Sequence, residues 1–306
     1  MGGVNVVEGT FEVDGGVKLH TKSWLLDGPA KAKLIVVHGF SDHVDRYYDL
    51  FPSLARRGIV VHGFDQRGWG KSVRKHADKG RTGPTATVLS DIAAFIKAKA
   101  REPADGVPVF VLGHSMGGGQ VLAFASTPQY DDIIAGIRGW ILEAPFLGFA
   151  PAVQPSWLTV ASGRLAARVV PNFRMFRPVP PEHLSRDPAV QESIAHDALM
   201  HNTGTLEGLA GMIDRAEHLS GGKLTLRPHV RSVFLAHGTA DMVTSFDTVK
   251  AYWGRQNLED GQFKAYEGWA HQLHAEPGKE EFYQDVGDWI LARCGDGAGS
   301  APESKL

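Results

Sequence analysis

Short hydrophobic runs alternate along the chain with longer segments in which hydrophobic positions recur every three or four residues. The runs are closely followed by Gly, Asp or Pro, as buried parallel strands often are, and they lie at 34–37, 59–64, 109–112, 140–142 and 233–236. In the longer segments the hydrophobic positions share one helical face, as they do from Val88 to Ile96. This alternation predicts an α/β fold, with a mostly parallel central sheet and helices on both faces.

One connection, between residues 145 and 231, is too long for a single crossover helix, which needs only about a dozen residues or slightly more. It is also rich in proline and in bulky hydrophobic residues such as Trp157 and Phe173. We therefore expect residues 1–145 and 232–293 to form the core, residues 146–231 to form an inserted cap, and residues 294–306 to form a flexible tail.

The composition limits the possible functions. Hydrophobic residues make up 43% of the 306 residues, which is enough for a large core. The formal charge is −2, from 32 Lys and Arg against 34 Asp and Glu, and no run of like charges accompanies it, so we expect no nucleic acid partner. No hydrophobic stretch approaches the roughly 20 residues that cross a bilayer, and the single cysteine, Cys294, cannot form an internal disulfide.

The last three residues, Ser304-Lys305-Leu306, match the signal that the peroxisomal import receptor reads at a free C-terminus. The preceding residues are rich in Gly, Ser and Pro, a composition that would leave the tripeptide accessible. We therefore expect a peroxisomal protein that binds this receptor, with the cytoplasm as the alternative location.

A candidate nucleophile stands in the motif Gly113-His114-Ser115-Met116-Gly117, which follows one predicted strand and precedes a helix-like segment. A serine on such a strand-to-helix turn needs glycine on both sides, because the turn is strained and the neighbouring backbone leaves no room for side chains. The five residues alone are a weak signal, but their position between a strand and a helix is specific. We therefore predict that Ser115 is a catalytic nucleophile.

A nucleophilic serine needs a histidine base within hydrogen-bond reach and a carboxylate that orients the base. In folds with this turn, the chain order is Ser, then acid, then His. Asp241 follows a late strand and is the candidate acid, with Asp247 as a weaker competitor in the following helix. His271 lies on the loop after one more strand and is the candidate base, with His274 competing for that role.

Two backbone N–H groups must stabilise the oxyanion that forms when the serine attacks a carbonyl group. One is expected from Met116, directly after the nucleophile. The other is expected from Phe40, on the loop after an early strand, where Gly39 lets the backbone approach closely. The neighbouring His38 is expected to brace this loop.

The 14 histidines show no spacing that gathers three metal ligands, and the chain has no His-Glu-x-x-His motif. The glycine-rich segments lack the complete spacing of a phosphate-binding loop. The sequence thus predicts neither a metal ion nor a cofactor.

Several of these motifs resemble those of the monoacylglycerol lipases of the α/β-hydrolase superfamily, in the group of serine aminopeptidase-like hydrolases and lysophospholipases. The resemblance extends over roughly residues 8–293. It rests on His38-Gly39-Phe40-Ser41-Asp42-His43 with Arg46-Tyr47, on residues 65–72, on residues 113–118, on Asp241, and on Tyr266-Glu267-Gly268 leading to His271-Gln272-Leu273-His274.

The resemblance implies that Ser115, Asp241 and His271 form a catalytic triad, and that Phe40 and Met116 supply the oxyanion hole. It also implies hydrolysis of a monoacylglycerol to glycerol and a free fatty acid through an acyl-enzyme, with the acyl chain held by the cap. An exposed cap would be able to contact a membrane or a lipid droplet. A small polar pocket for the glycerol head group would be lined by Asp42, Arg46, His114 and His274.

Other functions stay open at this stage. A lysophospholipase or a peroxisomal acyl-thioester hydrolase would use the same triad on another leaving group. A non-catalytic scaffold that binds a lipid or a protein partner would also have this fold, although such scaffolds usually lose a member of the triad.

Overall fold

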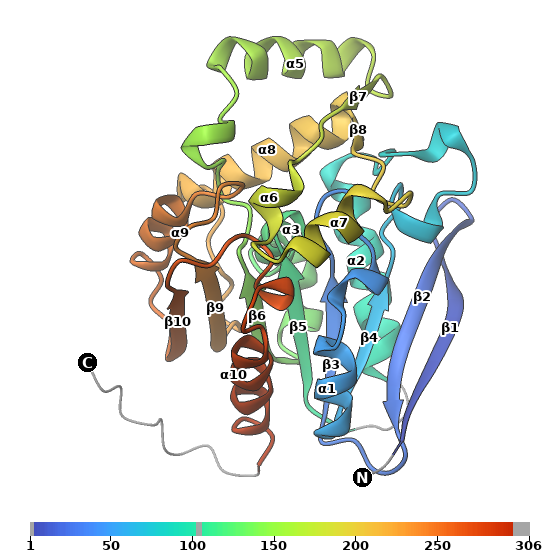
Figure 1. Cartoon of the computed structure of the whole chain (residues 1–306), viewed down its shortest axis with the longest axis vertical. Coiled ribbons are helices and arrows are strands. Elements are labelled where there is room, and N and C mark those ends of the chain that lie inside the picture. The colour runs from blue at the N-terminus through green and yellow to red at the C-terminus, as the bar shows by residue number, and fades with distance from the viewer. Residues whose placement is uncertain (1–2, 102–105, 296–306) are drawn as a thin grey trace.

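The computed structural model describes residues 3–101 and 106–295. Residues 1–2, 102–105 and 296–306 lie outside the described residues, and the predicted import signal Ser304-Lys305-Leu306 is among them. Figure 1 shows helices on both faces of a central sheet, with a further helical segment above the upper ends of the strands.

Eight strands form the central sheet, in the order β1-β2-β4-β3-β5-β6-β9-β10. β1 and β2 form an antiparallel hairpin at one edge, β2 pairs antiparallel with β4, and the remaining pairings are parallel. The predicted mostly parallel sheet is confirmed. The strand bounds are Val4–Val13 (β1), Val17–Leu26 (β2), Ala32–Val37 (β3), Ile59–Phe64 (β4), Val109–His114 (β5), Ile137–Glu143 (β6), Ser232–Gly238 (β9) and Asp260–Tyr266 (β10).

Side chains of the central strands alternate between two hydrophobic layers. In β3, Ile35 and Val37 belong to one layer, whereas Leu34 and Val36 belong to the other. Every residue of β3, β4 and β5 is buried, as expected for parallel strands that are covered on both faces. The helices that cover the sheet are α2 (Thr85–Ala100), α3 (Met116–Phe124) and α9 (Phe246–Trp253) on the first side, and α1 (Leu50–Arg56) and α10 (Glu280–Leu291) on the second. In Figure 1, α1 and α10 lie in front of the sheet, and α2 and α3 lie behind it.

Short elements complete this part of the fold. They are α4 (Asp131–Ile134) and the 3-10 helices η1 (Val44–Tyr47), η2 (Gly70–Ser72), η3 (His76–Asp78), η4 (Pro128–Tyr130) and η6 (Leu273–Ala275).

Between β6 and β9 the chain leaves the sheet and forms the segment above it in Figure 1, which we call the cap. Within the cap, β7 and β8 pair antiparallel as a separate two-stranded sheet. The helix α8 returns to the core, since its Leu219 is fully buried in the layer that contains α2 and α3. The cap elements are η5 (Pro151–Val153), α5 (Trp157–Val169), β7 (Arg174–Phe176), α6 (Pro181–Leu184), α7 (Pro188–Ala195), β8 (Thr203–Thr205) and α8 (Leu206–Ser220).

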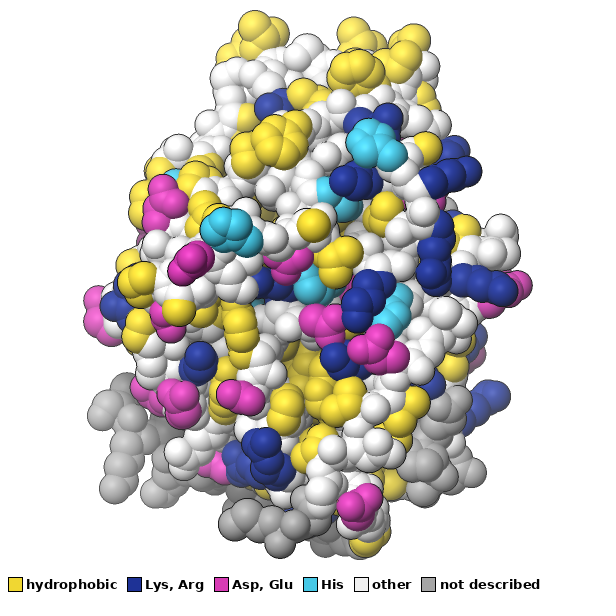
Figure 2. All heavy atoms as spheres, turned by 45° about the vertical axis from the view of Figure 1, so that its right-hand side comes forward, with side chains coloured by type: hydrophobic (Ala, Val, Ile, Leu, Met, Phe, Trp, Pro, Cys, Tyr) yellow, Lys and Arg dark blue, Asp and Glu magenta, His cyan; other side chains and the backbone are white. Residues whose placement is uncertain are grey.

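The outermost part of the cap exposes large hydrophobic side chains, and no residue of α5 is buried. Trp157, Leu165 and Val169 on α5 are 79%, 65% and 77% exposed, and Phe173 and Phe176 just after it are 60% and 65% exposed. We call these five side chains the outer cap surface. Figure 2, turned by 45° from Figure 1, shows hydrophobic side chains gathered at this upper end of the molecule. None of the helices in the described residues is both long enough and hydrophobic enough to cross a membrane.

Candidate active site

Ser115 occupies a strained turn between β5 and α3. Its φ of 53° and ψ of −119° lie in a region that residues other than glycine rarely adopt. A Cβ atom at Gly113 would lie 2.7 Å from the carbonyl oxygen of Gly117, and a Cβ atom at Gly117 would collide with the carbonyl oxygen of Val37. The close approach of the backbone therefore requires glycine on both sides of the serine, as the sequence motif predicts.

Two hydrogen bonds join the backbone of this turn to segments beyond α3. The N–H group of Ser115 donates to the carbonyl oxygen of Glu143 at 2.9 Å, and the N–H group of Phe146 donates to the carbonyl oxygen of Ser115 at 2.8 Å. The nucleophile is thus anchored to the end of β6 and to the start of the cap.

His271 and Asp241 form a hydrogen-bonded pair with 2.7 Å between His271 Nδ1 and Asp241 Oδ2, and both side chains are buried. The N–H groups of Val243 and Thr244 donate to Asp241 Oδ1 at 2.7 and 2.9 Å, and the Thr244 hydroxyl donates to Asp241 Oδ2 at 2.6 Å. Burial alone would raise the pKa of Asp241, but the imidazoles of His271 and His237, through their charge and their hydrogen bonds to the carboxylate, hold this pKa well below its usual range. An ionised Asp241 orients His271 with its Nδ1 proton toward the carboxylate, which leaves Nε2 able to accept a proton.

The competing acid and the competing base lie apart from this pair. Asp247 is exposed in the first turn of α9. His274 is fully buried, and its Nδ1 lies 2.7 Å from Oε1 of Glu143. Of the two candidate histidines, His271 is therefore the one that is hydrogen-bonded to the predicted acid, Asp241.

Two further residues of this region are not singled out by the sequence analysis. His237 Nε2 lies 3.1 Å from Asp241 Oδ2, so the carboxylate lies between two imidazoles. Glu143, the partner of His274, has a fully buried carboxylate directly behind the Ser115 backbone. Both residues carry a signal that the sequence contains. Each is a titratable residue at the carboxyl end of a hydrophobic parallel strand, where the sites of α/β proteins form.

The loop that contains Gly39 and Phe40 lies against the nucleophile. A Cβ atom at Gly39 would lie only 3.2 Å from the Cβ atom of Ser115. His38 braces this loop, since its Nε2 accepts a hydrogen bond of 2.9 Å from a backbone N–H group just after β4. In the described part of the chain, the N–H groups of Phe40 and Met116 have no hydrogen-bond acceptor. Two free N–H groups are therefore available in the segments that an oxyanion hole would use.

The residues predicted to form a head-group pocket are all buried and lie in one polar layer behind Ser115, and none of them lines the cavity beneath the cap. Arg46 contacts the cap, where its guanidinium donates to Ser193 Oγ at 3.0 Å. The other members lie closer together, and the rings of His114 and His274 are 5.1 Å apart. Their role toward a substrate stays a prediction. The four residues of this layer are Asp42, Arg46, His114 and His274.

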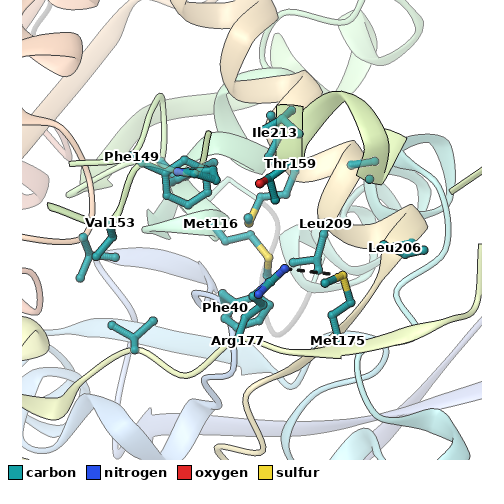
Figure 3. A pocket seen from close by; sticks show the side chains of 18 of the residues that line it. Phe40, Met116, Phe149, Val153, Thr159, Met175, Arg177, Leu206, Leu209 and Ile213 are labelled. Atoms are coloured by element: carbon teal, nitrogen blue, oxygen red, sulfur yellow. Dashed lines mark hydrogen bonds between the residues drawn. The ribbon is translucent and has the colours of Figure 1, made fainter. Parts of the chain in front are cut away.

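A cavity of about 490 Å³ opens at Ser115 beneath the cap. Among the described residues that line it, Arg164 and Arg177 are charged and none is an Asp or Glu. A cavity of this size with a mostly hydrophobic wall suits an extended hydrophobic ligand. Figure 3 shows several of the hydrophobic side chains that surround this space, from both the core and the cap, including Phe40, Met116, Phe149, Leu209 and Ile213.

One group of described side chains has the donor types of a metal site. The ligand atoms of His114, Glu143 and His274 lie within 4.8 Å of one another. However, His274 and Glu143 are already hydrogen-bonded to each other through Nδ1 and Oε1. We interpret His274 and Glu143 as a hydrogen-bonded pair, against which the ring of His114 packs, and assign no metal ion to these side chains.

Comparison with known proteins identifies relatives of this chain. Residues 28–278 match the family described as serine aminopeptidase, S33. A Schizosaccharomyces pombe protein that is provisionally named a monoglyceride lipase is 33% identical over 280 residues, which are 89% of this chain and 71% of the relative. The monoglyceride lipase of Rattus norvegicus is 28% identical and covers 91% of this chain and 88% of its own length.

The fold also has a counterpart among solved structures. A soluble variant of monoglyceride lipase from Saccharomyces cerevisiae, in complex with a substrate analogue, aligns with a TM-score of 0.83. The alignment covers 93% of this chain and 94% of that one, at 21% identity. This likeness confirms the α/β-hydrolase fold.

Proposed function

This chain belongs to the serine aminopeptidase S33 family of α/β-hydrolases and is a carboxylic ester hydrolase, and we propose that it cleaves monoacylglycerols to glycerol and a free fatty acid. One observation carries the proposal: a hydrophobic cavity of about 490 Å³ opens at Ser115, the residue in the strained turn. The acyl chain would occupy the cavity, and the ester carbonyl would lie at the serine.

In the proposed mechanism, His271 accepts the hydroxyl proton of Ser115 while the serine oxygen attacks the ester carbonyl. The ring of His271 lies 4.9 Å from that of His114, the residue before the serine, which supports this assignment. The N–H groups of Phe40 and Met116 donate to the oxyanion. His271 then protonates the departing glycerol oxygen, and the acyl group stays on Ser115. A water molecule gives a proton to His271 and attacks the acyl-enzyme, which releases the fatty acid and restores the serine.

The wall of the cavity favours an acyl chain over a peptide. An aminopeptidase would need an acidic group near the α-amine of its substrate, and none of the described residues in the wall is an Asp or Glu. Each buried methylene of an acyl chain contributes about 0.8 kcal/mol, so long-chain substrates gain most from this wall. The names of the relatives from S. pombe and R. norvegicus support the same substrate class.

We place the glycerol head group toward the buried polar layer of Asp42, Arg46, His114 and His274. The support is chemical, because a group with hydroxyls needs donors and acceptors, and the cavity wall offers few. A Cβ atom at Gly39 would lie 3.2 Å from both His114 and Ser115, so the layer begins directly beside the nucleophile.

Two associations complete the proposal. The outer cap surface, with Arg168 in the last turn of α5, has the hydrophobic and basic character of a segment that binds a membrane or a lipid droplet. The tripeptide Ser304-Lys305-Leu306, outside the described residues, would bring the protein to peroxisomes through the import receptor.

The function is tested on purified wild-type protein, with Ser115→Ala as the matched control. Turnover of a long-chain monoacylglycerol is compared with that of a lysophospholipid, an acyl-CoA thioester and an aminoacyl anilide. We expect the highest kcat/KM for the monoacylglycerol and no turnover by the variant. Preference for one of the other three would replace the proposed substrate, whereas an active Ser115→Ala variant would remove the mechanism.

A further inference from the structure

The proposed mechanism does not use the carboxylate of Glu143, although this group is fully buried beside the nucleophile. Its Oε1 accepts two hydrogen bonds from His274, at 3.1 Å from the backbone N–H group and at 2.7 Å from Nδ1. Its Oε2 has no hydrogen-bond partner among the described residues and lies 3.6 Å from Nδ1 of His114. The carboxylate is therefore placed between the rings of two histidines.

Glu143 carries a negative charge in this position. Burial acts to raise the pKa of its carboxyl group, but the two imidazoles and the hydrogen bonds from His274 hold that pKa below its usual value. A buried charge is costly, and a hydrophobic residue of similar volume often serves the fold as well or better. The presence of a charge at this point of the sheet therefore points to a role beyond folding.

The two histidines connect this charge to the predicted base. The ring of His114 lies 5.1 Å from that of His274 and 4.9 Å from that of His271. Tyr47 stacks on the face of His274 with 4.4 Å between ring centres, so His274 cannot turn freely. Glu143 holds Nδ1 of His274, and the ring of His114 contacts both that ring and the ring of His271. The position of the base thus depends on side chains that Glu143 orients.

We propose that Glu143 is a positioning residue for His271, which it supports by fixing the His274 and His114 rings and by stabilising the positive charge that forms on His271 during acylation. This inference rests on the proposed esterase mechanism and extends it by a second carboxylate. Asp241 supplies the direct hydrogen bond to the base from the loop after β9, and Glu143 supplies a charge from the carboxyl end of the neighbouring parallel strand β6.

Several titratable groups act on His271, and the test must separate Glu143 from them. Asp241 contacts the base from the loop after β9, and His237 contacts the same carboxylate. His114 faces the base from the end of β5, and behind it lie Asp42, which acts electrostatically on His114, and the pair of His274 and Glu143. A variant that removes charge while keeping shape is therefore needed, and Glu143→Gln meets this condition, because its amide oxygen can still accept the His274 hydrogen bonds.

The experiment measures kcat, KM and the pH profile of kcat/KM on a water-soluble ester for wild type, Glu143→Gln and Glu143→Asp. Removal of the negative charge makes a positive imidazole less favourable, so we expect the acid limb of the Glu143→Gln profile to move to lower pH. We expect kcat of this variant to fall by about tenfold, with a smaller change in KM. Glu143→Asp keeps the charge, so its acid limb should stay at the wild-type position even if its rate is lower. The control is Asp91→Asn, which removes another buried carboxylate, one that lies on α2 and pairs with Arg67, and should leave the profile unchanged.

A Glu143→Gln profile identical to that of wild type would overturn the inference, and so would equal displacement of the acid limb in Glu143→Gln and Glu143→Asp. Labelling with a fluorophosphonate distinguishes this failure from that of the proposed function. If wild type reacts with the probe at Ser115 and the profiles coincide, only the role of Glu143 is lost. If wild type does not react, the serine esterase mechanism itself is wrong.

Discussion

Arg186 of the cap donates two hydrogen bonds to Glu276, which lies in the loop that carries His271. The Arg186 N–H group contacts Oε1 at 2.7 Å, and its Nε contacts Oε2 at 2.5 Å. Glu276 is fully buried, and its Oε2 also accepts a hydrogen bond of 3.2 Å from the N–H group of Ala270, directly before His271. This carboxylate therefore ties the inner part of the cap, after α6, to the backbone beside the predicted base.

This contact predicts that Glu276→Gln lowers activity more than its effect on stability would suggest. Without the charge, the loop is held less firmly and His271 is less well placed, so we expect kcat to fall by roughly tenfold. The unfolding free energy should fall by about 1 to 2 kcal/mol, less than for a fully buried pair, because Arg186 is half exposed. Kinetics on a soluble ester and urea denaturation check both values. Arg227→Gln, which breaks the pair with Asp131 before β6, is the control and should keep kcat unchanged.

The strained turn predicts a gain in stability that accompanies a loss of activity. Glycine adopts a φ of 53° without the strain that a Cβ atom causes, so Ser115→Gly should stabilise the protein by about 1 kcal/mol. Ser115→Ala keeps the Cβ atom and serves as the matched variant, with a stability close to that of wild type. Both variants should be inactive and should not react with a fluorophosphonate. A Ser115→Gly protein that is less stable than Ser115→Ala in urea would contradict this reading of the turn.

Stability should decline as the pH falls below about 6.5, the ordinary pKa of histidine. Burial lowers the pKa of His114 to about 4 and also lowers that of His38. A histidine with a lower pKa in the folded than in the unfolded protein stabilises the fold above its unfolded value, and this contribution is lost as the pH falls toward the folded value. For His114 alone the loss is about 3 kcal/mol between pH 6.5 and 4. Urea unfolding at pH 7, 6 and 5 measures the decline, which should be shallower in His114→Asn.

The outer cap surface predicts binding to lipid surfaces. The double variant Trp157→Ser, Leu165→Ser removes two exposed hydrophobic side chains from α5 and should weaken binding to anionic phospholipid vesicles by at least about tenfold. Turnover of a soluble ester should stay at the wild-type level. Val6→Ser with Val7→Ser removes exposed hydrophobic groups from β1 and is the matched control in vesicle sedimentation. Equal weakening by both pairs would mean that α5 has no special role.

The C-terminal tripeptide predicts peroxisomal import. Deletion of Leu306 from a protein with an N-terminal fluorescent label should leave the label in the cytoplasm, because the receptor reads the complete tripeptide. Pro302→Ala, just before the signal, should still be imported. Microscopy with a peroxisomal marker distinguishes the two, and import of the shortened protein would argue against the signal.

The sequence predicts those parts of the site whose conformation is determined by neighbouring residues in the chain. The glycines beside Ser115 are required by the backbone within a few residues of them, so the motif alone predicts the turn. The pairing of His271 rather than His274 with Asp241 depends on the course of two loops in space. The sequence therefore leaves both histidines as candidates for the base, and the structure separates them.

Contacts between distant segments are the part that the sequence does not reveal. Glu143 meets a histidine 131 positions away, and Arg186 meets Glu276 across 90 positions. The end of a hydrophobic strand marks Glu143 itself, but no local pattern identifies its partner, because the partner comes from a distant loop. Burial of a carboxylate at the carboxyl end of a strand becomes visible only when the neighbouring strands and loops are in place.

The cap thus consists of two halves with different attachments. The half after α6 is joined to the loop of the predicted base through Arg186, whereas α5 is held by Arg164, whose ion pairs with Asp214 and Glu217 lie on α8. Mutations can therefore change one half of the cap without altering the attachment of the other. Mutations that adapt α5 to a new lipid environment leave the base in place, so differences among orthologous genes should accumulate in α5 and spare the residues that surround Glu276.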